Sequence, residues 1–176
     1  MIVPSGNLLV MQSEDLLRAY SSRQVTRIAV GGVLRRRIHG GYAVLLLQRV
    51  ADDEYGGLEE LPSGGVEPGE TIGEALAREI QEETGLTVLT VGPFLFDITY
   101  PSRRGVTAQL NFLIEVVGDP PIQVNPGEHE FFRWLPIADL ADSGVSPNVR
   151  RGLCRTVPGL ASLEDSAASQ RFPATI

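Results

Sequence analysis

The feature that most constrains the fold is one helical segment whose ends and faces are all marked in the sequence. Thr71 and Glu74 form a capping box, in which each side chain accepts a hydrogen bond from the other residue's backbone N–H. Gly85 suits the left-handed conformation that commonly ends a helix. Between these signals, Leu76 and Ile80 lie one helical turn apart. The segment therefore predicts a helix with one apolar edge, which requires a layer to pack against.

The neighbouring edge of this helix carries three glutamates. At about 100° of rotation per residue, Glu82 falls at about −60° and Glu83 at about +40° from Glu79. Like charges so close repel each other, by roughly a few tenths of a kcal/mol per exposed pair and by more when partly buried. A divalent cation reverses this effect, because Mg²⁺ binds carboxylate oxygens and keeps waters or phosphate oxygens in its remaining positions. Taken alone, such a glutamate-rich edge is more typical of a solvated helix face.

The flanking residues complete a longer pattern over Gly64–Leu86 that resembles the Nudix box at every fixed position. The matching positions are Gly64, Glu70, Arg78, Glu79, Gln81, Glu82, Glu83, Thr84, Gly85 and Leu86. This resemblance implies a hydrolase that uses Mg²⁺ or Mn²⁺ to cleave a phosphoanhydride bond in a nucleoside diphosphate linked to another group. It also implies an α/β/α sandwich with a mixed β-sheet, beside which the box forms a loop, a helix and a second loop.

The resemblance further implies roles for individual residues of the box. Glu79, Glu82 and Glu83 would bind the metal, and a backbone carbonyl at Ser63 would complete the set of ligands. Arg78 would support catalysis structurally by holding an acidic neighbour in place.

The loop before the helix is expected to place backbone close to the metal and the substrate. Gly64 and Gly65 would permit that approach, and Glu70 would support the loop or contact the metal's ligands. Many relatives have glycine at the position of Ser63, so this chain departs mildly from the family pattern there. Many relatives also have tryptophan at the position of Glu59, and a glutamate there does not favour stacking on a base.

A further acidic residue is expected from a separate part of the chain. Glu128 precedes Trp134 at the spacing where relatives carry an additional metal ligand or general base, and Glu130 is the reserve candidate. Because a carboxylate has to help activate the metal-bound water, we expect Glu83 or Glu82 to be the general base, ahead of Glu128. His129 is read as a spacer and Trp134 as a core residue.

Arginines near strand ends are candidates for binding substrate phosphates, although such side chains are more often solvated. Arg49 and Arg103 are the first candidates. The others are Arg35, Arg36, Arg37, Arg104 and Arg133.

Length, charge and cysteine content narrow the class of protein. A chain of 176 residues fits one domain of ordinary size. Its net charge of −7 argues against nucleic acid as a partner. The single cysteine, Cys154, excludes an intrachain disulfide and reads as a small core residue. No segment resembles a signal peptide or reaches the roughly 20 apolar residues of a membrane span. We expect a cytoplasmic protein, and a homodimer is open because many relatives form one.

The chain divides into a lead-in over residues 1–24, the Nudix domain over 25–158, and a tail over 159–176 that we expect to be disordered. Strands and helices mix without regular βαβ alternation, which indicates an α+β fold. A Gly40-Gly41 pair predicts a hairpin, and residues 51–70 and 118–128 are expected to be loops. The predicted strands are Thr26–Leu34, Tyr42–Arg49, Leu86–Val91, Phe94–Tyr100, Ala108–Val117 and Phe131–Leu135. The predicted helices besides the box helix are Ser13–Tyr20, Ile137–Asp142 and Pro147–Thr156.

The substrate remains open among three classes. Pro101, 15 residues beyond the box, resembles a feature of ADP-ribose pyrophosphatases. The spacing from Glu128 to Trp134 resembles diadenosine polyphosphate hydrolases, and the short chain suits nucleoside triphosphate pyrophosphatases. A catalytically silent nucleotide-binding or regulatory module of the same fold is the alternative from another class, although such proteins typically lose a box glutamate.

Overall fold

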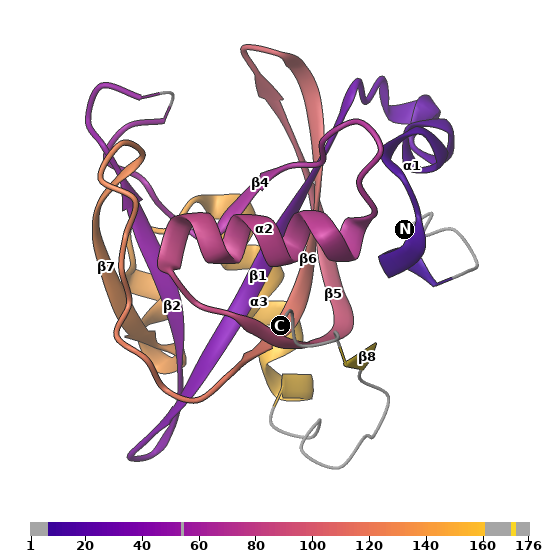
Figure 1. The fold of residues 1–176 in the computed structure, drawn as a ribbon. Helices are drawn as coiled ribbons and strands as arrows, with labels where there is room; N and C mark the ends of the chain where they lie inside the picture. Colours follow the sequence, from indigo (N-terminus) through magenta and orange to yellow (C-terminus); the bar gives the residue numbers. More distant parts are fainter. Residues whose placement is uncertain (1–6, 54, 161–169, 172–176) are drawn as a thin grey trace.

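The computed structural model describes residues 7–53, 55–160 and 170–171 (Figure 1). The helices are α1 (Ser13–Ala19), α2 (Ile72–Thr84) and α3 (Pro147–Leu160), with 3₁₀ turns η1 (Leu8–Val10), η2 (Ser21–Arg23) and η3 (Ile137–Asp142). The strands are β1 (Arg27–Ile38), β2 (Gly41–Arg49), β3 (Glu59–Glu60), β4 (Ser63–Gly65), β5 (Val88–Ser102), β6 (Gly105–Val116), β7 (His129–Pro136) and β8 (Gln170–Arg171).

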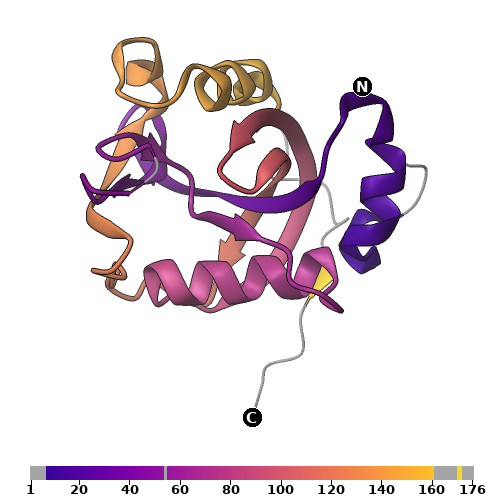
Figure 2. The ribbon, with the colours of Figure 1, turned by 90° about the horizontal axis from the view of Figure 1, so that it is seen from above.

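Strand β1 organises a single mixed sheet. It runs parallel to β6 and antiparallel to β4, and its far end forms a hairpin with β2. The strand order is β3-β2-β1-β6-β5-β8, with β7 beside β2. Figure 2 shows α2 and α3 on opposite sides of this sheet. The prediction of an α+β sandwich with a mixed sheet is therefore confirmed.

Helix α2 begins and ends as its sequence predicts. The capping box of Thr71 and Glu74 is present, and Gly85 ends the helix with a φ of 70°. Leu76 and Ile80 are buried against the strands on this side of the sheet. Burying two such side chains stabilises the fold by roughly 1.5–3 kcal/mol each. The apolar edge thus fixes α2 on the sheet and turns the glutamate edge toward the loop that precedes it.

The second layer is held by a close contact between α3 and β5. A Cβ atom at Gly152 would lie 2.3 Å from ring atoms of Phe96, so the absence of a side chain lets the helix approach the strand. Val149 and Leu153 lie in the same core cluster as Phe96.

Gly152→Ala is expected to lower the free energy of unfolding by about 1–3 kcal/mol, because the new methyl group overpacks this contact. A loss of stability would be informative, because helix propensity alone predicts a gain: alanine is more favourable than glycine in a helix by about 1 kcal/mol. Chemical denaturation measures the change, with Cys154→Ala on the exposed side of the same helix as the control. A Gly152→Ala protein as stable as the wild type would show that the contact does not limit packing.

Several predictions about local structure are corrected by the fold. The two strands expected within residues 86–100 form one strand, β5, because bulges absorb the irregular stretch around Phe94. The loop expected over residues 51–70 contains β3 and β4, which are too short to show a periodic pattern. Cys154 is exposed and not a core residue, because Leu153 takes the buried position beside it.

The two ends of the chain differ in what the structure describes. In the predicted lead-in, Leu16 and Tyr20 are buried in the core cluster that contains α2. Of the tail predicted to be disordered, residues 161–169 and 172–176 lie outside the described residues. No helix in the described part of the chain is both long and apolar enough to cross a membrane.

Candidate metal centre and active site

The loop before α2 is pressed against the glutamate edge of that helix. Strand β4 pairs with β1, with Gly64 opposite Val30. This pairing fixes the position of the loop relative to the sheet. A Cβ atom at Gly64 would lie 2.0–2.2 Å from the carboxyl atoms of Glu79. Glycine is therefore required at position 64 to leave room for this carboxylate.

Arg78 connects the loop before α2 to the helix through several hydrogen bonds. Its Nε and Nη2 donate to the two oxygens of Glu70 at 2.7 and 2.9 Å. Its Nη1 donates to Glu79 at 2.8 Å and to Glu82 at 3.2 Å. Nη2 also donates to the carbonyl of Gly65 at 2.9 Å. These contacts raise the pKa of Arg78, chiefly through Glu70. They also keep the carboxylates of Glu79 and Glu82 beside the loop that contains Gly64 and Gly65, here called the glycine loop.

Arg78→Lys is expected to weaken Mn²⁺ binding about 10-fold, because an ammonium group cannot hold Glu70 in two places while also reaching Glu79. Calorimetric titration of the metal-free protein measures this change. Arg18→Lys, in an exposed i,i+3 ion pair on α1, is the matched control. An unchanged affinity in Arg78→Lys would mean that the arginine does not position the carboxylates.

The three helix glutamates lie in different environments. Glu83 is 2% exposed, whereas the side chain of Glu82 is 55% exposed. Burial raises the pKa of Glu83 well above its ordinary value, and the neighbouring carboxylates of Glu60, Glu79 and Glu128 add to this effect. Burial also raises the pKa of Glu79, although Arg78 partly offsets it.

Glu83 is held by the loop at one of its oxygens. The backbone N–H of Ser63 donates to Glu83 Oε2 at 2.8 Å. This bond favours the charged form of the carboxylate and ties the end of α2 to β4.

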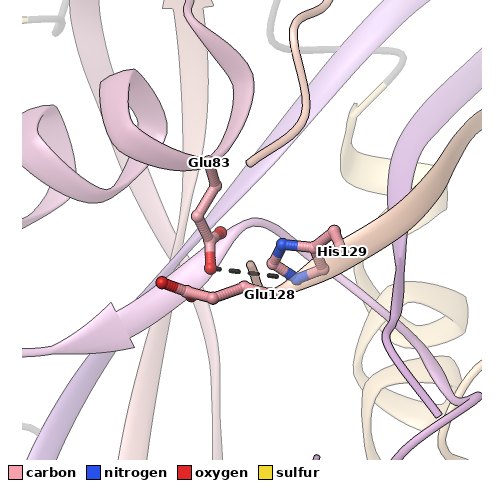
Figure 3. A group of neighbouring side chains, drawn as sticks. All are labelled: Glu83, Glu128 and His129. Carbon is pink, nitrogen blue, oxygen red and sulfur yellow. Dashed lines mark ion pairs between the residues drawn. The ribbon is translucent and has the colours of Figure 1, made fainter. Parts of the chain in front are cut away.

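A second loop brings Glu128 and His129 to the same place. Oxygen atoms of Glu83 and Glu128 and a ring nitrogen of His129 all lie within 4.8 Å of one another (Figure 3). Asn125 organises this loop: its carbonyl accepts from the backbone N–H of His129 at 2.9 Å, and its amide donates to Glu128 at 3.2 Å. The reserve candidate, Glu130, accepts from the backbone N–H of Ala51 at 3.0 Å.

The arginines predicted to bind substrate phosphates contact acidic side chains or lie in an exposed turn. Arg49 bonds to Asp53 and Glu60, so its guanidinium supports a local network, and its contact with substrate stays a prediction. Arg103 lies exposed in the turn between β5 and β6. Arg133 pairs with Glu59, at 2.6 Å from its Nη2, so a charge pair occupies the position where relatives have tryptophan.

The three consecutive arginines, Arg35, Arg36 and Arg37, line a separate cavity of about 380 Å³. Leu86, which follows the end of α2, also lines it. Arg36 lies 4.3 Å over the ring of Trp134 there, and Trp134 packs partly buried against the core. None of the box glutamates lines this cavity.

Three residues of the site were not assigned a role from the sequence. Arg27 opens β1, and a Cβ atom at Gly65 would lie 2.0 Å from its Nη2, so its guanidinium rests on the glycine loop. Glu60 and His129 face each other at 3.3 Å beside Glu83. Only the pairing of β2 with β3 and β7 brings the last two together, which no local pattern reveals.

The residues at this site suit a hard divalent cation. Glu79, Glu83 and Glu128 offer oxygen donors, and Gly64 leaves room for the carboxylate of Glu79. A buried, repelling group of carboxylates is also the arrangement that a bound cation stabilises most.

Comparisons with known proteins identify relatives of this chain. A putative 8-oxo-dGTP diphosphatase 2 of Mycobacterium tuberculosis is 35% identical over 143 residues, which cover 78% of this chain and 95% of that protein. The nucleoside triphosphatase NudI of Escherichia coli is 36% identical over 119 residues, 61% of this chain and 84% of that protein.

Solved structures share the fold. A MutT protein from Methanosarcina mazei Go1 matches with a TM-score of 0.66 at 25% identity, covering 76% of this chain and 94% of that one. A C. elegans Ap4A hydrolase matches with a TM-score of 0.67 at 24% identity, covering 78% and 99%. The model of the NUDIX domain matches residues 25–154, and with these relatives it shows that the chain belongs to the Nudix hydrolase family.

Proposed function

We propose that this Nudix hydrolase acts on nucleoside triphosphates, releasing a nucleoside monophosphate and pyrophosphate by attack of water on a phosphorus. The coarser activity, hydrolysis of a phosphoanhydride in a nucleotide derivative, follows from the family and its named relatives. The triphosphate is our choice among the three substrate classes.

The extent of the sequence likeness supports this choice. The two named triphosphate enzymes align with 95% and 84% of their own lengths at 35% and 36% identity. The Ap4A hydrolase, at 24% identity, supports the fold only. The proline that resembles ADP-ribose pyrophosphatases, Pro101, is a paired residue of β5 whose carbonyl accepts from Tyr55.

Glu79, Glu83, Glu128 and the Ser63 carbonyl are proposed to hold Mg²⁺ or Mn²⁺, with Glu82 as a more exposed ligand. The cation, when bound, lowers the pKa of a coordinated water and neutralises charge on bridging phosphate oxygens. The single observation that carries the proposal is the burial of Glu83 among other carboxylates beside the glycine loop. A carboxylate so placed is suited to accept the proton of the attacking water.

The first residue of β1 is proposed to supply a cationic group for phosphate. Arg27 rests on Gly65, and the structure describes no carboxylate paired with it. Since guanidinium groups bind phosphate oxygens well, we propose Arg27 as a substrate contact ahead of Arg49.

Arg27→Gln is expected to raise KM for a triphosphate about 10-fold or more, because a hydrogen bond between charged groups contributes roughly 1.5–3 kcal/mol. Steady-state kinetics measure it, and Arg151→Gln, exposed on α3, is the control. Equal KM values for Arg27→Gln and the wild type would remove Arg27 from the substrate site.

Ranking substrates by kcat/KM tests the proposal directly. The panel contains dGTP, 8-oxo-dGTP, other nucleoside triphosphates, ADP-ribose, a nucleotide sugar and a dinucleoside polyphosphate, each with Mg²⁺. Triphosphates are expected to exceed the others by at least tenfold, with pyrophosphate as product. A higher value for ADP-ribose or a dinucleoside polyphosphate would replace the substrate class. No turnover of any compound would favour the silent binding module, although Glu79, Glu82 and Glu83 are all retained.

A further inference from the structure

His129 is a fully buried histidine placed between two carboxylates. It is 0% exposed. Its Nε2 lies 3.3 Å from Glu60 Oε1. The same nitrogen lies 3.9 Å from Glu83 Oε1 (Figure 3). Its other ring nitrogen, Nδ1, has no hydrogen-bond partner among the residues described by the structure. The imidazole therefore directs one nitrogen at the site and buries the other.

These surroundings decide which nitrogen carries the proton. An ionised carboxylate only accepts hydrogen bonds, so Nε2 between Glu60 and Glu83 is stable there as an N–H donor. A bare Nε2 would face two acceptors and would leave a buried N–H on Nδ1 unsatisfied, which costs about 1–3 kcal/mol. Because an N–H nitrogen has no lone pair for a metal, His129 in this form donates to Glu60 and faces Glu83 without being a metal ligand itself.

The backbone and a neighbouring ion pair fix this donor in place. A bulge between Gln48 and Arg49 interrupts the pairing of β2 with β7 directly opposite His129, and such bulges re-aim side chains. Arg49 bonds to the same Glu60 oxygen that accepts from His129. The loop carbonyl of Asn125 holds the backbone of His129 from the other side.

We propose that His129 is a positioning residue that holds Glu83, with Glu60 and Arg49 completing the support behind it. The backbone N–H of Ser63 donates to Glu83 Oε2, and the His129 ring, hydrogen-bonded to Glu60, lies 3.9 Å from Glu83 Oε1. The buried imidazole therefore limits how far this carboxylate can turn. Residues that orient metal ligands in this way typically change metal affinity by about 10–100-fold when they are removed. The inference rests on the proposed role of Glu83 as a metal ligand.

A pair of amide substitutions tests the position of the donor. Glutamine can place its amide nitrogen near the site of Nε2, whereas the shorter asparagine places it near Nδ1. His129→Asn is expected to weaken Mn²⁺ binding about 10–100-fold, and His129→Gln to stay within about 3-fold of the wild type. Binding is measured by the paramagnetic resonance of free Mn²⁺, with thermal unfolding of each protein as the check on folding. His39→Asn, at the exposed β1–β2 turn, is the matched control.

The outcomes separate this inference from the proposed function. Wild-type protein that binds no Mn²⁺ would overturn the metal role of Glu83 and this inference with it. Wild-type binding that survives in folded His129→Asn, or that falls equally in both variants, would overturn only the positioning role. If His129→Asn does not fold, the ¹⁵N signals of the wild-type imidazole with Mg²⁺ decide the question. A proton on Nε2 and a bare Nδ1 are expected, and the opposite tautomer would contradict the proposal.

Discussion

Glu83→Gln is expected to lower kcat for a triphosphate by about 10³-fold while making the metal-free protein more stable by about 1 kcal/mol. Catalysis falls because the amide cannot accept the proton of water and binds a hard cation poorly. Stability rises because Glu83 is buried and its pKa is raised by that burial and by nearby carboxylates. Steady-state kinetics and denaturation in EDTA measure the two effects in one protein.

The stability effect has a defined dependence on pH. Since the folded-state pKa of Glu83 is raised, the metal-free native state binds its proton more tightly than the unfolded chain does. Stability is then lost as pH rises from the ordinary glutamate pKa through the raised one. This pH dependence should be absent in Glu83→Gln, whose advantage in stability grows as pH rises above the ordinary glutamate pKa. Exposed Glu82→Gln should change unfolding by less than about 0.5 kcal/mol. A Glu83→Gln enzyme with nearly intact kcat would contradict the catalytic assignment.

Gly64→Ala is expected to lower kcat/KM by about 10²-fold with only a small loss of stability. The added Cβ atom would lie 2.0–2.2 Å from the Glu79 carboxyl group, so that carboxylate must move by about 1 Å or more. The backbone of β4 can remain in place, because Glu79 is a side chain with rotatable bonds. Kinetics with purified enzyme measure the loss, and Gly92→Ala in β5 is the control, with a nearest contact of 3.2 Å.

A double-mutant comparison shows whether this loss acts through Glu79. In a Glu79→Ala background there is no carboxylate to displace, so adding Gly64→Ala should reduce kcat/KM little further. If the two losses instead multiply, the alanine at position 64 must disturb the site by another route.

The helix itself could be predicted because all its signals are local. Thr71, Glu74 and Gly85 set its ends, and Leu76 and Ile80 set its buried edge, each within one turn of the next. The three glutamates share one arc, as the helical rotation requires. Their different exposures could not be predicted, because residues from other segments, Ser63 and His129, lie against the buried Glu83.

The outer support of the site depends on contacts between distant segments. His129 is 46 residues from Glu83 in the chain (129 − 83), and read alone it is a spacer in a loop. Its role emerges only from the register of β7 against β2, which sets it opposite Arg49 beside a bulge. Arg49 likewise reads as a strand-end cation until β3 places Glu60 next to it. A helical wheel carries no information about such pairings.

The local sequence also fails to predict two of the strands, β5 and β3, as they are in the structure. A bulged strand such as β5 interrupts its own alternation, so its sequence reads as two segments around Phe94. The two-residue β3 is shorter than any window in which alternation can be recognised. Of these two strands, β3 belongs to the site, because its Glu60 lies beside His129.

The central claim is that the carboxylates beside the glycine loop hold a divalent cation that is required for phosphoanhydride hydrolysis. The most direct measurement follows conversion of the preferred triphosphate to monophosphate and pyrophosphate in Mg²⁺, then in EDTA, and then after Mg²⁺ is restored. Turnover is expected to stop with the chelator and to return with the cation in the wild type, and to remain absent throughout in Glu83→Gln. Turnover that persists in EDTA, or that Glu83→Gln matches, would contradict the account.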